Sequence, residues 1–358
     1  MKKTWRWLGE KDKITLPMLR EIGIEGVVTA LHDVPNGEIW TLDAILDLRD
    51  DIESEGLEWS VVESLPVSEL IKCGRADNRL IDNYILSLAN LGTAEIKTVC
   101  YNFTPVIDRI SFDINYAQAG EFTSLYPDQV YFAYFDCFIL KRKDAEKNYS
   151  AKEMQRVYAL DKTITEKEKS RLIDTISLNT KVFANDCTSN PLSILKSLLS
   201  LYNGVDKDEL RENMKYFLNQ MMPVCEEFGI KMCVYPDNLP YQIFGLPHIV
   251  TKLEDIEWIL KTVYNPHNGL AICSDSLNPN IQNNIPELTR KFAANTHFIH
   301  LRSADMQIND DLIKVSQPRE YEYMIKAMHN FEKYRPSVPV CVGHGHLSDF
   351  YNLRRFVH

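Results

Sequence analysis

The stretch GVVTAL at residues 26–31, followed after a loop by LDAILDLRDDIESE at residues 42–55, decides the fold of this chain. The first run is short and contains β-branched residues, whereas the second repeats apolar residues at spacings of three and four. A short β-rich run followed by an amphipathic helix is the unit from which parallel sheets are built. Residues 26–55 therefore predict one strand–helix unit.

The same unit recurs along the chain. The predicted strands are Thr4–Leu8, Gly26–Leu31, Leu57–Glu63, Ile96–Phe103, Ile230–Tyr235, Gly269–Ser274, His297–Arg302 and Val338–Gly343. Helical patterns between them cover Leu42–Glu55, Asn78–Leu91, Lys207–Phe228, Lys252–Val263 and Glu320–Phe331. Strands and helices in this alternation favour an α/β fold, a (β/α)8 TIM barrel, over an open doubly wound sheet. We expect residues 1–358 to form a single TIM-barrel domain.

One segment departs from the alternation. Residues 113–203 separate the fourth and fifth predicted strands, which is far longer than an ordinary strand–helix connection. The segment contains the aromatic run Tyr131–Phe138 and a strongly charged helical stretch around Asp161–Ile173. We expect this insertion to form a lid over the carboxyl ends of the strands or an oligomer contact.

The composition excludes several classes of protein. The 358 residues contain 40 Lys and Arg against 50 Asp and Glu, a net charge of −10, which argues against a nucleic-acid-coating surface. An anionic ligand must therefore be held by a local group of cations. No window of about 18 apolar residues and no signal-peptide run is present, so the sequence predicts a cytoplasmic protein without a membrane span. The eight cysteines form no CxxC pair and are interpreted as reduced, mostly buried thiols.

Polar residues lie at the ends of the predicted strands, where the active site of a parallel barrel is built. They are Arg6, His32, Glu63, Asn102, Tyr235, Asp237, Cys273, His300, Arg302, His344 and His346. Thiolate and imidazole ligands suit Mn, Fe or Zn, so this group could hold a divalent metal. Plainer interpretations stay open: Cys273 as a small core residue, Arg302 as a scaffold ion pair, Tyr235 as a packing residue, and His344 and His346 as turn residues.

Longer stretches carry a family resemblance. They are WRWLG from Trp5, GVVTALHDVPNGEIW from Gly26, WSVVESLPVSELIK from Trp59, VCYNFTPV from Val99, PDNLPYQIFGLPHI from Pro236, CSDS from Cys273, HLRS from His300 and HGH from His344. In these stretches the chain resembles the mannonate dehydratases, which are xylose-isomerase-like TIM barrels. The resemblance implies a bacterial metal-dependent hydro-lyase of hexuronate catabolism that converts D-mannonate to 2-keto-3-deoxy-gluconate. It also implies Mn or Fe as cofactor, a small sugar acid as ligand, no nucleic-acid or membrane partner, and a homo-oligomer.

The resemblance implies four metal ligands, and the chain departs from that pattern. Cys273 and His300 match two of the ligands, but Tyr235 stands where the family has His in HPDDPP, and Gly343 where it has Asp in RPDHGH. Other departures are Ser68, Asp275 and Cys341, which replace a family His, Gly and Arg. We expect weak metal binding or none, unless Asp237, Asp275 or His346 acts as a substitute ligand, and correspondingly weak or absent dehydration.

The resemblance also suggests roles for the remaining residues. His344 or His346 would act as acid or base, and Arg302 would bind substrate oxygens. Six residues would line the sugar-acid pocket: Arg6, His32, Asn36, Glu63, Asn102 and Tyr235. Two alternatives stay open, namely a catalytically degenerate member that binds a sugar acid or acts as an oligomer partner, and a sugar isomerase or epimerase.

Overall fold

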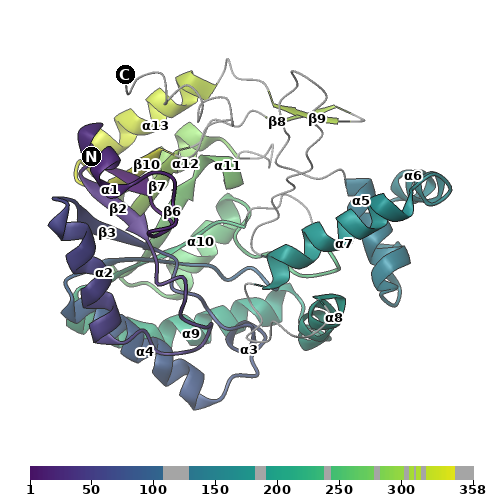
Figure 1. The fold of residues 1–358 in the computed structure, drawn as a ribbon, viewed down its shortest axis with the longest axis horizontal. Coiled ribbons are helices and arrows are strands. Elements are labelled where there is room, and N and C mark those ends of the chain that lie inside the picture. The colour runs from purple at the N-terminus through teal and green to yellow at the C-terminus, as the bar shows by residue number, and fades with distance from the viewer. Residues whose placement is uncertain are drawn as a thin grey trace.

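In the computed structural model, eight parallel strands close into a barrel (Figure 1). The structure describes residues 1–107, 129–181, 191–237, 243–277, 283–301, 306–309, 312–315 and 320–342. The barrel strands are β1 Lys2–Arg6, β2 Gly26–Thr29, β3 Glu58–Glu63, β4 Thr98–Tyr101, β5 Lys231–Val234, β6 Asn268–Cys273, β7 Thr296–Leu301 and β10 Pro339–Val342. Their order around the barrel is β1-β10-β7-β6-β5-β4-β3-β2. The predicted TIM barrel is confirmed, and each predicted strand overlaps an observed one.

Helices alternate with these strands and cover the outside of the barrel. They are α1 Leu16–Glu21, α2 Leu42–Ser54, α4 Asn78–Thr93, α9 Lys207–Phe228, α10 Leu253–Thr262, α12 Ile285–Phe292 and α13 Glu320–Tyr334. Their ends follow from local chemistry: Asp77 caps α4 by accepting a hydrogen bond from the Leu80 amide, and α9 ends at Gly229 with a φ of 69°. In the described part of the chain, no helix is long and apolar enough to cross a membrane.

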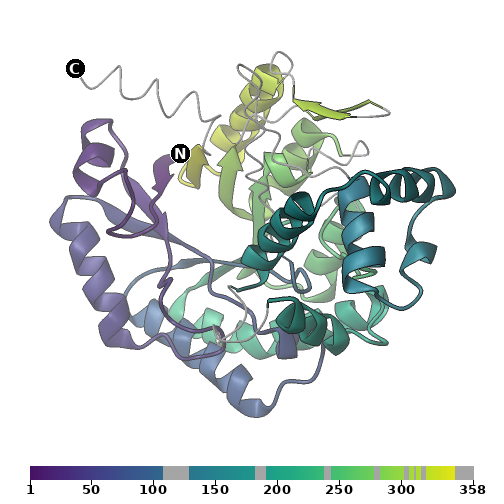
Figure 2. The ribbon, with the colours of Figure 1, turned by 45° about the vertical axis from the view of Figure 1, so that its right-hand side comes forward.

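The insertion lies between β4 and β5, as predicted. Its described part contains α5 Gln129–Tyr134, the π-helix η1 Phe135–Leu140, the 3-10 helix η2 Ala145–Asn148, α6 Ala151–Asp161, α7 Glu166–Lys181 and α8 Pro191–Leu201. In both views α5, α6 and α7 stand on the side of the barrel away from α2 and α4 (Figures 1 and 2).

The charged stretch around Asp161–Ile173 is divided between two helices rather than forming one. Helix α6 ends at Asp161, and α7 begins at Glu166. The break has a local cause, because the Glu168 carboxylate accepts hydrogen bonds from the amide and hydroxyl of Thr165, which caps the new helix.

Five short elements complete the described part of the fold. They are α3 Glu69–Lys72, α11 Ser274–Leu277, the 3-10 helix η3 Ala293–Asn295, and an antiparallel pair formed by β8 Met306–Asn309 and β9 Leu312–Val315. The β8–β9 pair forms a separate two-stranded sheet and was not predicted from the sequence.

Two buried clusters hold the barrel together. The larger one fills the space between strands and helices. The smaller one fills the barrel itself and consists of Val28, Val61, Cys100, Cys233, Tyr235, Ala271, Cys273, Phe298 and Cys341. Because side chains alternate across a strand, every second strand residue points inward, and small thiols and alanine fit the narrow interior. Of the seven described cysteines, all are free thiols and six are buried, which confirms the prediction for those residues.

Candidate active site

Six of the candidate residues lie at the carboxyl end of the barrel. Arg6, Glu63 and Cys273 are the last residues of β1, β3 and β6, and His300 is the penultimate residue of β7. Asn102 and Tyr235 directly follow β4 and β5. Since all eight strands run in the same direction, these positions share one end of the barrel, as the sequence predicts.

Four of these side chains form a buried network across the barrel. The Tyr235 hydroxyl lies 2.7 Å from Nδ1 of His300, which in turn is 3.9 Å from a Glu63 carboxylate oxygen. The other oxygen of Glu63 lies 3.8 Å from Nε of Arg6. Tyr235, Glu63 and His300 are all buried, whereas Arg6 is partly exposed. The network therefore joins β1, β3, β5 and β7 and ends in a cation that can reach a ligand entering from solvent.

Two thiols flank His300 on the neighbouring strands. Cys273 of β6 and Cys341 of β10 are both register partners of His300. Burial, with the negative charge of Glu63 nearby, raises the pKa of the Cys341 thiol to about 12. Cys341 therefore stays a neutral thiol at pH 7 and contributes no charge to the site.

His32 and Asn36 lie in the loop after β2. His32 is exposed, and its pKa is lowered by partial desolvation and by the positive charge of Arg6. The loop is fixed to α4, because the side-chain amide of Asn83 donates to the Gly37 carbonyl at 2.8 Å and the Trp40 amide donates to the Ser87 hydroxyl at 3.0 Å.

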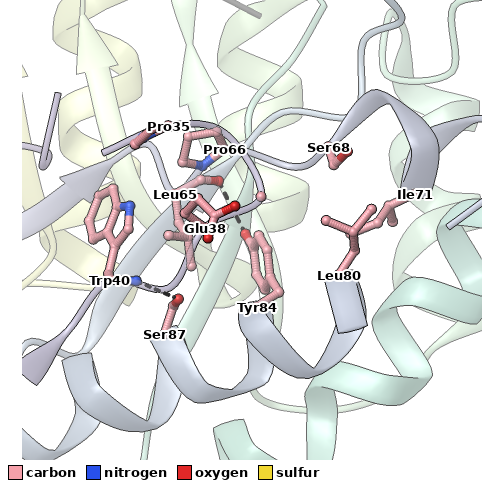
Figure 3. A pocket seen from close by; sticks show the side chains of 11 residues that line it. Pro35, Glu38, Trp40, Leu65, Pro66, Ser68, Ile71, Leu80, Tyr84 and Ser87 are labelled. Atoms are coloured by element: carbon pink, nitrogen blue, oxygen red, sulfur yellow. Dashed lines mark hydrogen bonds between the residues drawn. The ribbon is translucent and has the colours of Figure 1, made fainter. Parts of the chain in front are cut away.

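A hollow lies between this loop, the loop after β3, and α4 (Figure 3). It is narrow and partly open to solvent. Two polar groups that line the hollow form hydrogen bonds within the protein: the Tyr84 hydroxyl donates to the Leu65 carbonyl, and the Ser68 hydroxyl accepts from the Leu70 amide at the start of α3. The hydrogen bonds of the residues that line the hollow thus fix the loops of the site. Ser68, which stands at the position of a family histidine, caps the amino end of α3.

Protein groups surround the carboxylate of Asp237, which the sequence analysis named as a possible substitute ligand. Its carboxylate is fully buried and accepts hydrogen bonds from the amides of Ile249 and Val250, each at 3.1 Å, and from the Thr104 hydroxyl. Burial raises its pKa, but these bonds and His248 together bring it below its ordinary value. Asp237 therefore ties the loop at 243–250 to the end of β5. Sequence reasoning missed Thr104 and His248, although both lie in the quoted family stretches.

Five predicted residues are not placed. Arg302, Gly343, His344 and His346 lie outside the described residues, and nothing is described of the Asp275 side chain. Their predicted roles stay predictions.

The described residues do not fit the four-ligand metal site that the resemblance implies. Among them, no group of three or more His, Cys, Asp or Glu side chains is arranged to hold a metal ion. Cys273 and His300 are adjacent in register, but the Tyr235 hydroxyl contacts Nδ1 of His300 directly. Among the described side chains at this end of the barrel, His300 is thus held by a hydrogen bond to Tyr235.

Comparisons with known proteins agree with the sequence resemblance. The family model described as D-mannonate dehydratase (UxuA) matches residues 1–349. A mannonate dehydratase from Marinomonas sp. is 40% identical over 305 residues, which cover 85% of this chain and 77% of that protein. One from Chromohalobacter salexigens is 37% identical over 356 residues, covering 97% of this chain and 90% of that protein.

Solved structures give the same result for the fold. The crystal structure of mannonate dehydratase from Streptococcus suis serotype 2 superposes with a TM-score of 0.71 at 27% identity, covering 97% of this chain and 86% of that one. A D-psicose 3-epimerase from Clostridium cellulolyticum H10 superposes with a TM-score of 0.52 at 10% identity, covering 96% of this chain and 84% of that one. At this identity the epimerase shares the barrel fold, and the likeness carries no information about the reaction.

Proposed function

Because the chain belongs to the D-mannonate dehydratase family, we propose that it is a carbon–oxygen lyase that removes water from D-mannonate to give 2-keto-3-deoxy-gluconate. One observation supports the proposal above the others: the family match covers residues 1–349 and so every strand of the barrel. In agreement with it, a network of four side chains lies at the end of the barrel where TIM-barrel enzymes act, namely Arg6, Glu63, His300 and Tyr235. The epimerase alternative has only the shared fold in its favour.

The elimination step requires two proton transfers. A base removes the proton from C2, and the electrons of that C–H bond form the double bond between C2 and C3. The hydroxyl on C3 leaves with its bonding electrons and takes up a proton to become water. The resulting enol then tautomerises to the 2-keto acid. Negative charge develops next to the substrate carboxylate, so a fixed positive charge there lowers the barrier.

We assign the positive charge to Arg6. Arg6 is the last residue of β1 and is partly exposed. Because its Nε lies 3.8 Å from a Glu63 carboxylate oxygen, the guanidinium can also bind an incoming carboxylate. Glu63 can accept hydrogen bonds from the sugar hydroxyls, and Asn102 lies at the same end of the barrel to orient them. By the resemblance, Arg302 would bind substrate oxygens and His344 or His346 would carry the proton transfers.

The direct test is a turnover assay. Purified protein is incubated with D-mannonate, with and without added Mn²⁺, and the 2-keto acid is measured. D-gluconate, which differs only at C2 and would give the same product, is the control substrate. We expect product from D-mannonate and none from D-gluconate. Equal turnover of the two acids, or none of either under both conditions, would refute the proposal.

A variant pair tests the assignment of the pocket. Glu63→Gln keeps the shape of the side chain but removes the charge that lies between Arg6 and His300. We expect kcat/KM for D-mannonate to fall by about 10²-fold, the size of effect that follows the loss of one fixed polar group from an active site. Glu58→Gln, at the opposite end of the same strand and exposed, is the matched control and should leave kcat/KM unchanged.

A further inference from the structure

The bond between Tyr235 and His300 crosses a strand. Tyr235 follows β5, and His300 belongs to β7, with β6 between them in the barrel. The hydroxyl of one and Nδ1 of the other are 2.7 Å apart, and the rings meet edge to face with centroids 6.3 Å apart. Cys273, which ends β6, belongs with Tyr235 to the cluster that fills the barrel. The hydrogen bond thus occupies the space in which side chains at positions 235, 273 and 300 would together bind one ion.

We propose that Tyr235 is a positioning residue that takes the place of a metal ion: its hydroxyl holds Nδ1 of His300 and thereby keeps divalent metal from the site in the unaltered chain. The inference deepens the proposed function, because it concerns the same pocket. It goes beyond the loss of a ligand, since a tyrosine that only failed to bind metal would leave the imidazole available.

The chemistry of the hydrogen bond supports this inference. If the phenol donates to Nδ1, the lone pair of Nδ1 is used and Nε2 of the neutral ring carries the other proton, so neither nitrogen offers a lone pair to an ion. An ion that binds His300 must therefore displace either the phenolic proton at Nδ1 or the ring proton at Nε2. Binding of the ion would also break the hydrogen bond of Tyr235, which is only 3% exposed, and its phenol would then need another partner.

The charges around the pair act in the same direction. Glu63 is the carboxylate next to His300, at 3.9 Å, and it is already 3.8 Å from the guanidinium of Arg6. The positive charge of Arg6 opposes a second cation at short range, and in a buried site that repulsion is poorly screened. The network thus satisfies its own charges with protein groups.

The test is a binding measurement with Co²⁺ on the full chain, without substrate. Co²⁺ bound by a thiolate gives a charge-transfer absorption band, which reports whether Cys273 is a ligand. Tyr235→Phe removes the hydroxyl alone, and Tyr235→His replaces it with a ligand. We expect Co²⁺ to bind Tyr235→Phe about tenfold more tightly than the unaltered chain and Tyr235→His about 100-fold more tightly, within the range that outer groups exert on metal affinity.

Two controls locate the effect. Tyr101→Phe removes a buried phenol from the adjacent strand β4, where the ring packs outward against Phe217 of α9, and should leave Co²⁺ affinity unchanged. Cys273→Ser in the Tyr235→Phe background should abolish the absorption band.

The result can contradict the proposal in two ways. Equal affinity of the unaltered chain and Tyr235→Phe would show that the hydroxyl does not keep metal out, and tighter binding by the unaltered chain would make Tyr235 itself a ligand. Because Tyr235→Phe changes one atom, it decides the question even if Tyr235→His does not fold. The affinity ratio needs no substrate, so failure of D-mannonate turnover leaves this test intact, and the converse holds as well.

Discussion

Two histidines of one strand have opposite surroundings. His300 points into the barrel beside Glu63, whereas His297 lies at the amino end of β7 against Arg335, whose guanidinium is 3.0 Å from its Nδ1. Burial first, and then Arg335 and Lys231, lower the pKa of His297 to about 3. Gly269 leaves space for this ring, since a Cβ there would lie 2.3 Å from it. His297 is therefore a neutral packing residue, and no protons are exchanged there near pH 7.

The lowered pKa of His297 predicts acid sensitivity. Between about pH 6.5 and 3 the unfolded chain binds this proton and the folded chain does not, so this contribution to stability is complete above pH 6.5 and declines as the pH falls. The decline should approach about 1.4 kcal/mol per pH unit. We expect His297→Gln, compared by urea unfolding at pH 7 and pH 5, to lose less stability on acidification than the unaltered chain. His329→Gln, at an exposed position of α13, serves as the control and should follow the unaltered chain. Parallel curves for all three proteins would contradict the prediction.

At the scale of elements, a buried ion pair attaches the insertion to the barrel. Lys72 and Glu69 of α3 are 2.7 Å apart and almost fully buried. Lys72 also donates to the Thr104 carbonyl after β4, and Glu69 accepts from the Val106 amide and from the hydroxyl of Tyr202, which follows α8. One pair thus joins the loops after β3 and β4 to the end of the insertion.

Breaking this pair should be costly. Lys72→Met leaves Glu69 buried without its cation, and we expect the free energy of unfolding to fall by about 3–5 kcal/mol. Tyr202→Phe removes one hydrogen bond to Glu69 and should cost only about 1–2 kcal/mol, with faster amide exchange in α8. Chemical unfolding and hydrogen exchange measure these effects. Equal losses for the two variants would contradict the view that charge dominates the contact.

Features that depend on neighbouring residues in the chain were predicted well, and features that depend on distant residues were not. Helix α9 was predicted as Lys207–Phe228, the range observed, because Asp206 caps it and Gly229 ends it. The partners Glu69, Lys72 and Tyr202 were not predicted, since the hydroxyl and the carboxylate that meet are 133 residues apart in the chain. The break after Asp161 was missed because the cap at Thr165 lies inside a stretch of continuous helical periodicity.

At the scale of the whole molecule, the candidate site belongs to no single element. Arg6, Glu63, Tyr235, Cys273 and His300 come from five strands, and the sequence predicts their meeting only because a parallel barrel places all carboxyl ends together. The alternation of strands and helices therefore predicted that these residues lie at one end of the barrel. It could not predict the bond between Tyr235 and His300, which depends on the side chains across the barrel.

The rate of dehydration should reflect the barrel as a whole, because the four ligand positions implied by the family resemblance come from four strand ends. Tyr235 and Gly343 replace two of those ligands, and Tyr235 also holds His300. Two ligands retain an ion poorly at ordinary free-metal levels, so we expect the unaltered chain to turn over D-mannonate at well below about 1 per second. Tyr235→His combined with Gly343→Asp should raise both Mn²⁺ affinity and kcat, and each single variant should raise them less, because ligands of one ion act together. Steady-state kinetics at several Mn²⁺ concentrations measure both quantities. Turnover by the unaltered chain at about 1 per second or faster would mean that this barrel performs the reaction without the two replaced ligands.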